Sequence, residues 1–167
     1  MNETIIVRTG TPADVHLMMD LALAACEENG LSRPNPEKLL NEIWSSLNLH
    51  FGVVGIIGEQ GKPLESAILL RTESLWYSDE LSLVERAIFV APDFRQAKGG
   101  RASRLCEFAK SAAEKLGLPL VIGILSNHRT EAKVRLYTRH FGTPTGAYWI
   151  VNGHTGASQT AGGDVGR

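Results

Sequence analysis

The segment from Ile88 to Leu105 constrains the fold more than any other part of the chain. It reads as a strand that ends near Val90, a polar turn with Gly99 and Gly100, and then a helix. Glycine allows positive φ and a close approach of backbone to ligand, and the first turn of a helix offers unpaired N–H groups at its positive end. Within ten residues the segment also carries four cations, Arg95, Lys98, Arg101 and Arg104. It therefore predicts a phosphate or pyrophosphate site, with a solvated strand-to-helix turn as the alternative.

The same segment lacks the spacings of two common phosphate-binding motifs. It has no G-x-x-x-x-G-K-[ST], which disfavours a P-loop fold, and no G-x-G-x-x-G, which disfavours a dinucleotide-binding fold. It resembles instead the coenzyme A pyrophosphate motif of the GNAT acetyltransferases, V-x-P-x-x-R-x-x-G-x-G/A. The residues in register are Val90, Pro92, Arg95 and Gly100, whereas Lys98 stands where the first glycine is usual.

This resemblance implies acetyl-coenzyme A as the cosubstrate. The backbone of Val90 would contact the pantetheine arm, and the backbone of residues 95–100 would cradle the pyrophosphate. Asn127, at the end of an apolar strand, either binds the pantetheine amides or caps that strand. The coenzyme-binding residues predicted in this way are Phe89, Val90, Arg95, Gln96, Ala97, Lys98, Gly99, Gly100, Arg101 and Asn127.

A second segment, at residues 130–142, resembles the GNAT segment N-x-x-A-x-x-L-Y-x-x-x-G-F. Leu136 and Tyr137 match it, and Thr130 and Lys133 stand where Asn and Ala are usual. In the family this tyrosine lies near the coenzyme sulfur and can protonate the leaving thiolate. The resemblance therefore implies Tyr137 as the general acid, the alternative being a tyrosine that only packs its ring under the sheet.

The attacking amine must lose a proton, and we expect Glu85 to be the general base. It lies on the strand that leads into the phosphate turn, where many GNAT enzymes carry a carboxylate. A glutamate in a partly apolar cleft has a raised pKa that suits this task. The alternative is a strand glutamate that is solvated or paired with Arg86. Asp79 and Glu80 are weaker candidates, and a water molecule can also take the proton.

Apolar periodicity predicts the order β-α-α-β-β-β-α-β-α-β. The expected strands are 4–8, 51–57, 65–76, 81–90, 120–125 and 147–151, and the expected helices are 12–28, 35–47, 100–116 and 130–141, the last capped by Thr130. The order predicts an α/β (α+β) fold with a mixed, mostly antiparallel central sheet and helices on both sides, which is also the GNAT architecture. The wholly apolar strand 120–125 is expected to be buried on both faces.

The helices carry apolar stripes that predict their buried faces. These are Val15, Met18, Met19 and Ala22 in the first helix, Leu39, Leu40, Ile43, Trp44 and Leu47 in the second, and Ala102, Leu105, Cys106, Ala109, Ala113 and Leu116 in the third. Cys26 and Cys106 fall in such patterns and are expected to be buried free thiols.

The composition is that of an ordinary globular domain. The chain has 167 residues, 43% of them hydrophobic, and a net charge of −1, so no overall field draws it to nucleic acid or an anionic membrane. We expect one domain at residues 1–153 and a disordered tail at 154–167, which is rich in Gly, Ser and Thr. A signal core, a membrane span and a Cys/His metal cluster are not evident, so a cytoplasmic protein without a metal is expected.

Three functions remain open at this point. The first is an acyl-CoA-dependent N-acyltransferase that acetylates an unidentified amine. The second is a GNAT-like module that binds coenzyme A or another phosphate ligand without catalysis. The third is a nucleotide or nucleic-acid binder that uses a second basic cluster, Arg129, Lys133, Arg135 and Arg139, although no nucleic-acid-binding motif is present. The oligomeric state, monomer or homodimer, is not predicted.

Overall fold

The computed structural model describes residues 5–95, 100–125, 129–147 and 149 of the chain. The predicted tail at 154–167 lies outside these residues. In chain order the elements are β1 (Arg8–Thr9), the 3-10 helix η1 (Pro12–Asp14), α1 (Val15–Asn29), α2 (Pro36–Leu47), β2 (Gly52–Ile57), β3 (Ser66–Ser74), β4 (Leu81–Val90), the 3-10 helix η2 (Pro92–Phe94), α3 (Arg101–Leu116), β5 (Leu120–Val121) and α4 (Thr130–Phe141).

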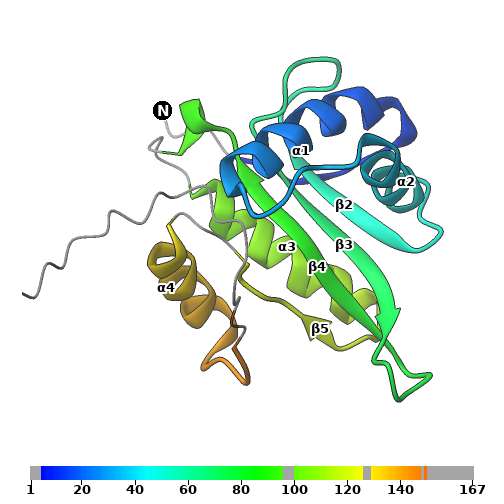
Figure 1. Cartoon of the computed structure of the whole chain (residues 1–167), viewed down its shortest axis with the longest axis vertical. Coiled ribbons are helices and arrows are strands. Elements are labelled where there is room, and N and C mark those ends of the chain that lie inside the picture. Colours follow the sequence, from blue (N-terminus) through cyan, green and yellow to red (C-terminus); the bar gives the residue numbers. More distant parts are fainter. Residues whose placement is uncertain (1–4, 96–99, 126–128, 148, 150–167) are drawn as a thin grey trace, which may run out of the picture.

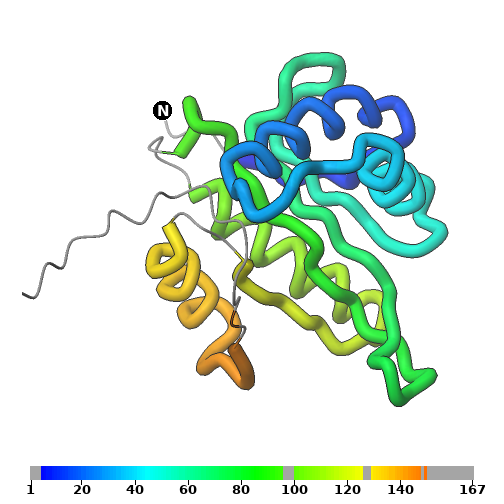
Figure 2. Tube along the Cα trace, in the orientation of Figure 1, coloured from blue at the N-terminus to red at the C-terminus, as the bar shows by residue number. Residues whose placement is uncertain are grey.

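The strands form one sheet in the order β1-β2-β3-β4-β5 (Figure 1). Neighbours from β1 to β4 are antiparallel, and β5 runs parallel to β4. The predicted mixed, mostly antiparallel sheet is therefore confirmed. The connection between β3 and β4 projects from one end of the molecule, and α4 lies at the side of the sheet next to β4 and β5 (Figure 2).

Helices cover both faces of the sheet, as predicted. Alternate side chains of a strand point to opposite faces, and here they enter two separate apolar clusters. One cluster joins α1 and α2 to the face formed by Val54, Ile56, Ala67 and Leu69. The other joins α3 to the face formed by Ile57, Ile68, Leu70 and Leu83.

Local signals in the sequence explain where the first two helices begin. Asp14 is fully buried at the start of α1 and accepts hydrogen bonds from both Nη atoms of Arg8, at 2.7 and 2.8 Å, and from the N–H of Thr11 at 2.9 Å. The bond to Arg8 is the main reason that the pKa of Asp14 is lowered. At α2, the Asn35 side chain accepts from the N–H of Lys38 at 3.1 Å. The bond of Asn35 satisfies an N–H group that the first turn of α2 leaves unpaired, whereas the bonds of Asp14 fix the chain just before α1.

Three residues of the predicted apolar faces are exposed instead of buried. In α2 the core contact is made by Ile43 and Leu47, whereas Leu40 is 41% exposed and Trp44 is 47% exposed. Each of these two lies one residue beyond a residue of the buried row, which rotates it by about 100° away from the sheet. Leu116, the last residue of α3 before its cap Gly117, is 54% exposed.

Some of the predicted strands and one helix start differ from the structure. The first strand has only Arg8 and Thr9 rather than 4–8, and Ala147 and Trp149 of the predicted strand 147–151 are not in a strand, the rest of that segment lying outside the described residues. Residue Arg129, with φ 57°, caps α4, and Thr130 is already its first helical residue. Both cysteines are free, but Cys26 is only half-buried while Cys106 is buried as predicted.

Candidate active site

A fork between β4 and β5 opens the main cleft of the molecule. The two strands pair only at Leu83 with Leu120 and at Val84 with Val121. Beyond these pairs they separate, so the predicted strand 120–125 ends at Val121, and Leu125 is 56% exposed rather than buried on both faces. Residues 121–125 line one side of a cleft of about 660 Å³, and residues 84–89 of β4 line the other. Side chains of α1, α2 and α4 complete its walls.

A β-bulge in β4 decides which side chains face the α3 side of this fork. In the register with β3, Leu69 pairs with Ala87 but Leu70 pairs with Glu85, so Arg86 is an extra residue. Without the bulge, Glu85 and Ala87 would lie on the same face of the strand. With it, Glu85 joins the face of Leu70, on the side of the sheet where α3 packs.

Glu85 lies at the point where the two strands part. Its Oε2 accepts a hydrogen bond from the N–H of Gly123 at 3.3 Å. Burial raises the pKa of the Glu85 carboxyl to about 7, against the opposing effects of the Gly123 N–H and of the positive charge of Lys133. The alternative partner considered from the sequence, Arg86, is instead paired with Glu73. Glu85 is therefore a carboxyl that can gain or lose a proton near neutral pH.

Tyr137 faces the same cleft from α4. Its side chain is 7% exposed, and its ring meets that of Phe141 edge-on with centroids 5.6 Å apart. Desolvation is the main cause that raises the pKa of Tyr137, and the nearby Glu85 and Cys106 add to it. Cys106 of α3 is fully buried, and burial raises the pKa of its thiol to about 12. Both groups therefore keep their protons at neutral pH, and Tyr137 holds one that it can donate.

A second, smaller hollow of about 210 Å³ adjoins the cleft where β4 ends and α3 and α4 begin. Tyr137 lines it together with five of the predicted coenzyme-binding residues, Phe89, Val90, Arg95, Gly100 and Arg101. The structure therefore brings together the strand end, the start of α3 and the tyrosine helix that the sequence singled out. The predicted residues Gln96, Ala97, Lys98, Gly99 and Asn127 lie outside the described residues.

Two arginines predicted to serve an anion are held in contacts within the protein. Arg95 donates from Nε to the carbonyl of Val90 at 2.8 Å and from Nη2 to Glu28 at 2.5 Å. Arg101 donates to Glu65 at 2.6 Å and lies over the ring of Phe94, 4.9 Å from its centroid. These side chains therefore fix the walls of the hollow, because each is already paired with a carboxylate.

The backbone at the start of α3 remains suited to an anion. Gly100 caps the helix with φ 64°, a left-handed conformation that favours glycine. No side chain of this cap accepts a hydrogen bond from the first-turn N–H groups. The positive end of this 16-residue helix, where the cap residue has no side chain, is a favourable place for a phosphate.

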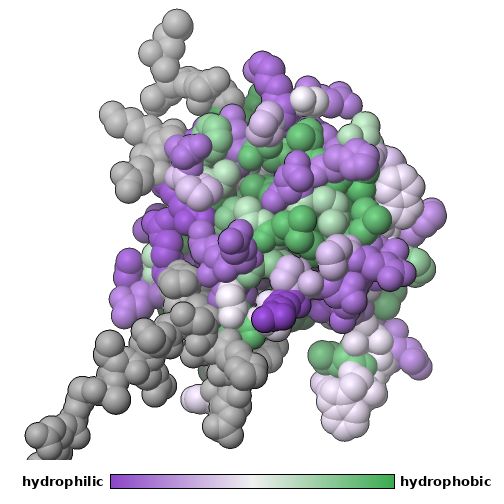
Figure 3. Space-filling view, turned by 45° about the horizontal axis from the view of Figure 1, so that its top comes forward, coloured by the Kyte–Doolittle hydropathy of each residue, from purple (hydrophilic) through white to green (hydrophobic). Residues whose placement is uncertain are grey.

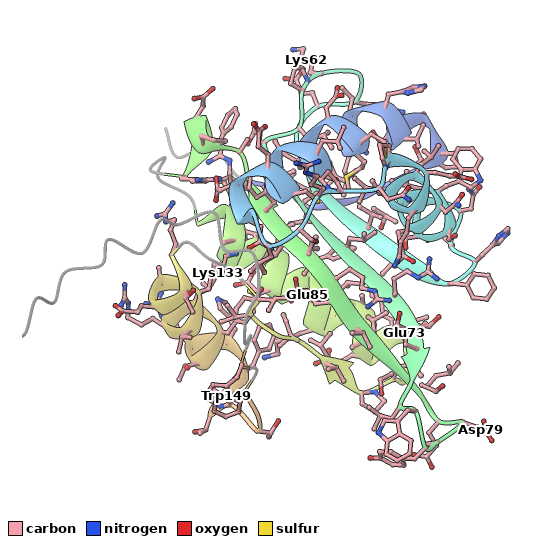
Figure 4. The ribbon with its side chains drawn as sticks, in the orientation of Figure 1. Lys62, Glu73, Asp79, Glu85, Lys133 and Trp149 are labelled. Atoms are coloured by element: carbon pink, nitrogen blue, oxygen red, sulfur yellow. The ribbon has the colours of Figure 1, made fainter. Side chains whose placement is uncertain are left out.

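Lys133 is a site residue whose position the sequence analysis did not anticipate. It lines both the cleft and the smaller hollow, one helical turn before Tyr137. Its pKa is lowered, mainly by desolvation, while Glu85 and Glu28 oppose that effect. Figure 4 shows Lys133 on α4 and Glu85 on β4, facing the same region. The sequence feature that could have indicated this position is the four-residue spacing from Lys133 to Tyr137, which places both side chains on one face of a helix.

Other candidates from the sequence lie away from the cleft. Asp79 is at the far end of the β3–β4 connection, well removed from Glu85 (Figure 4), and Glu80 follows it in the chain. Of the second basic cluster, Arg129 and Lys133 line the smaller hollow, whereas Arg135 and Arg139 are exposed. The cluster therefore does not form a single basic face.

No family model and no curated protein matches the sequence. Solved structures match the fold. AAC(6')-Iy, in complex with the bisubstrate analogue CoA-S-monomethyl-acetylneamine, is 14% identical (TM-score 0.67; 89% of this chain and 97% of that one covered). An aminoglycoside acetyltransferase from an uncultured soil metagenomic sample is 15% identical (TM-score 0.64; 89% and 98% covered). The ribosomal-protein-alanine N-acetyltransferase of Brucella melitensis is 14% identical (TM-score 0.66; 89% and 99% covered).

These likenesses establish the fold. The chain has the architecture of these acetyltransferases, and the GNAT-like fold predicted from the sequence is confirmed. In the described part of the chain, no helix combines the length and apolar character needed to cross a membrane.

Proposed function

We propose that this protein is an N-acyltransferase that moves an acetyl group from acetyl-coenzyme A to an amine. The observation that carries the proposal is the meeting of Glu85 and Tyr137 at one cleft, which adjoins a hollow lined by the coenzyme-motif residues. The similar structures support an acetyl donor and an amine acceptor, since one holds a coenzyme A bisubstrate analogue and another is named for alanine N-acetylation.

The described residues fit coenzyme A at the smaller hollow. The uncapped N–H groups at the start of α3 would hold the pyrophosphate, and Phe89 and Val90 at the end of β4 would flank the pantetheine arm. Arg95 lies over the ring of Phe89, 5.1 Å from its centroid, and its pair with Glu28 holds this wall in place. When bound, acetyl-coenzyme A supplies an acyl group activated as a thioester.

Glu85 and Tyr137 divide the proton transfers between them. Glu85 accepts the proton that the amine loses as its nitrogen bonds to the acyl carbon, either directly or through one water molecule. Tyr137 donates its hydroxyl proton to the sulfur as the carbon–sulfur bond breaks. The two groups come from β4 and α4 and share the desolvated wall that shifts both pKa values. Desolvation makes Glu85 a stronger base, and a site that excludes water limits competing proton exchange.

Calorimetry with coenzyme A, followed by a thiol-release assay with a panel of amines, tests the proposal. We expect micromolar binding, or about −7 to −9 kcal/mol, and release of free thiol with at least one amine. Binding without release for every amine, with acetyl-coenzyme A left intact, would instead indicate the non-catalytic coenzyme A module considered above. Absence of binding at millimolar coenzyme A would contradict both.

A further inference from the structure

The wall of the cleft that α1 and α2 form has an apolar part. α1 contributes Leu21, Ala22 and Ala25, and α2 contributes Leu39. The strands behind them add small and aliphatic side chains, among them Leu69 and Ala87. On the face drawn in Figure 3, apolar side chains gather near the centre and polar ones surround them. An acceptor that enters beside α1 and α2 therefore meets mostly hydrocarbon.

The carboxylates that line the cleft are mostly neutralised by partners within the protein. Glu28 is paired with Arg95 at 2.5 Å. Glu42 lies between two arginines, 3.8 Å from Arg71 and 3.7 Å from Arg86. Among the described residues that line the cleft, this leaves Glu85 as the one carboxylate without an ion pair within 4 Å.

Cations balance the charge of the lining. Lys38 of α2 and Lys133 of α4 line the same cleft as the three glutamates, and among the described residues neither has an ion-pair partner within 4 Å, whereas Arg86 is paired with Glu42 and Glu73. A ligand with several ammonium groups would bring like charges toward these residues and find one unpaired carboxylate to meet them. Discrimination by like charge and by unpaired, desolvated polar groups is a general source of specificity.

We propose that the acceptor is an amine with a single positive charge on an apolar body, and that polycationic amines are disfavoured. This inference rests on the proposed function, since it concerns the same cleft. The single ammonium lies next to Glu85 and gives up one proton to solvent before it reacts. The neutral amine then loses its second proton to Glu85 as its nitrogen bonds to the acyl carbon, and the apolar body packs against Leu21, Ala22 and Ala25 of α1. Burial of that body provides the binding energy, at about 25 cal/mol for each Å² removed from water.

A binding experiment separates this inference from catalysis. The full chain is saturated with coenzyme A and titrated calorimetrically with 2-phenylethylamine, which carries one ammonium group, and with spermidine, which carries three. We expect 2-phenylethylamine to bind at least about tenfold more tightly. Equal or tighter binding of spermidine, or no binding of either amine, overturns the inference.

A matched pair of variants tests the role of the apolar wall. Ala25 lines the cleft, whereas its neighbour Ala24 is exposed and is not part of the lining. Ala25→Asp should lower the preference for 2-phenylethylamine about tenfold or more, because it adds a carboxylate to the wall. Ala24→Asp carries the same helix-propensity cost and should leave the preference unchanged. An unchanged preference in folded Ala25→Asp contradicts the placement of the acceptor against α1.

Thiol release with the same two amines distinguishes the two proposals. Faster release with spermidine overturns the inference about the amine and supports the acyltransferase function. Selective binding of 2-phenylethylamine without release from any amine supports the inference about the cleft and contradicts the catalytic function.

Discussion

The backbone N–H of Gly123 donates to the carboxylate of Glu85 across the fork of β4 and β5, at 3.3 Å. This contact joins the two strands just beyond their last paired residues, Val84 and Val121. It stabilises the ionised form of Glu85, while burial, the larger effect, stabilises the neutral form. The balance leaves the pKa of this carboxyl at about 7, where a base works most effectively at neutral pH.

The pH dependence of catalysis follows from this value. The base must be ionised, so kcat/KM should rise with pH and level off above the pKa of Glu85 at about 7. Glu85→Gln removes the base and should lower kcat about 10²- to 10⁴-fold, and the rise near pH 7 should disappear. Initial rates from pH 5 to 9 measure both effects. If kcat/KM of the variant still fell at low pH as it does in the unchanged protein, the base would be another group.

The same pKa affects stability with the opposite sign. Glu85 has a higher pKa in the folded chain than the ordinary value of 4.5, so between 4.5 and about 7 the folded state binds more protons. Stability from this group is therefore lost as pH rises through that window. Glu85→Gln should stabilise the protein at pH 8 by up to about 3 kcal/mol and much less at pH 4. Urea unfolding at the two pH values checks the difference, and an equal effect at both would contradict it.

Tyr137→Phe separates proton donation from packing. The ring and its contact with Phe141 remain, so stability should change by less than about 1 kcal/mol. The rate should fall about 10²- to 10⁴-fold while affinity for coenzyme A stays near that of the unchanged protein. Steady-state kinetics measures the rate, and calorimetry measures the affinity for coenzyme A. Unchanged turnover in a folded variant would leave Tyr137 a packing residue.

Lys133→Met should shift the rise of kcat/KM with pH to higher pH values. The ammonium of Lys133 lowers the pKa of Glu85, and its loss removes that effect. Lys133→Arg keeps the charge and should restore most of the original profile. Arg135→Met, on the exposed side of α4, serves as the control and should leave the profile unchanged. A Lys133→Met profile that coincides with that of the control would show no coupling between Lys133 and Glu85.

Gly100→Asp should abolish or greatly weaken binding of coenzyme A. The change strains a residue with φ 64° and places a negative charge at the start of α3, where the pyrophosphate would lie. Gly61, with φ 79° in a distant turn, supplies a control with similar backbone strain. Gly61→Asp should cost similar stability without affecting coenzyme A binding. Normal affinity in folded Gly100→Asp would place the phosphate elsewhere.

Local patterns were sufficient for most of the elements. Asn35 and Pro36 start α2, and Gly30 and Gly117 end α1 and α3 in left-handed conformations, because caps depend on a few neighbouring residues. The helix boundaries were therefore nearly correct. The strand predicted at 120–125 was too long, since its apolar sequence does not reveal that its partner diverges after Val121.

The sequence by itself determined which residues are the candidates for the proposed chemistry. The strand–turn–helix segment and the tyrosine segment identified Val90, Gly100 and Tyr137, and the strand before the turn identified Glu85. The tertiary structure decided where they lie and which partners they have. The extra residue Arg86 turns Glu85 toward the α3 side, and the pairing of Arg95 with Glu28 and of Arg101 with Glu65 occupies cations expected to bind the ligand. Strand register and ion pairs between distant segments depend on which surfaces pack together, and a local pattern does not contain that information.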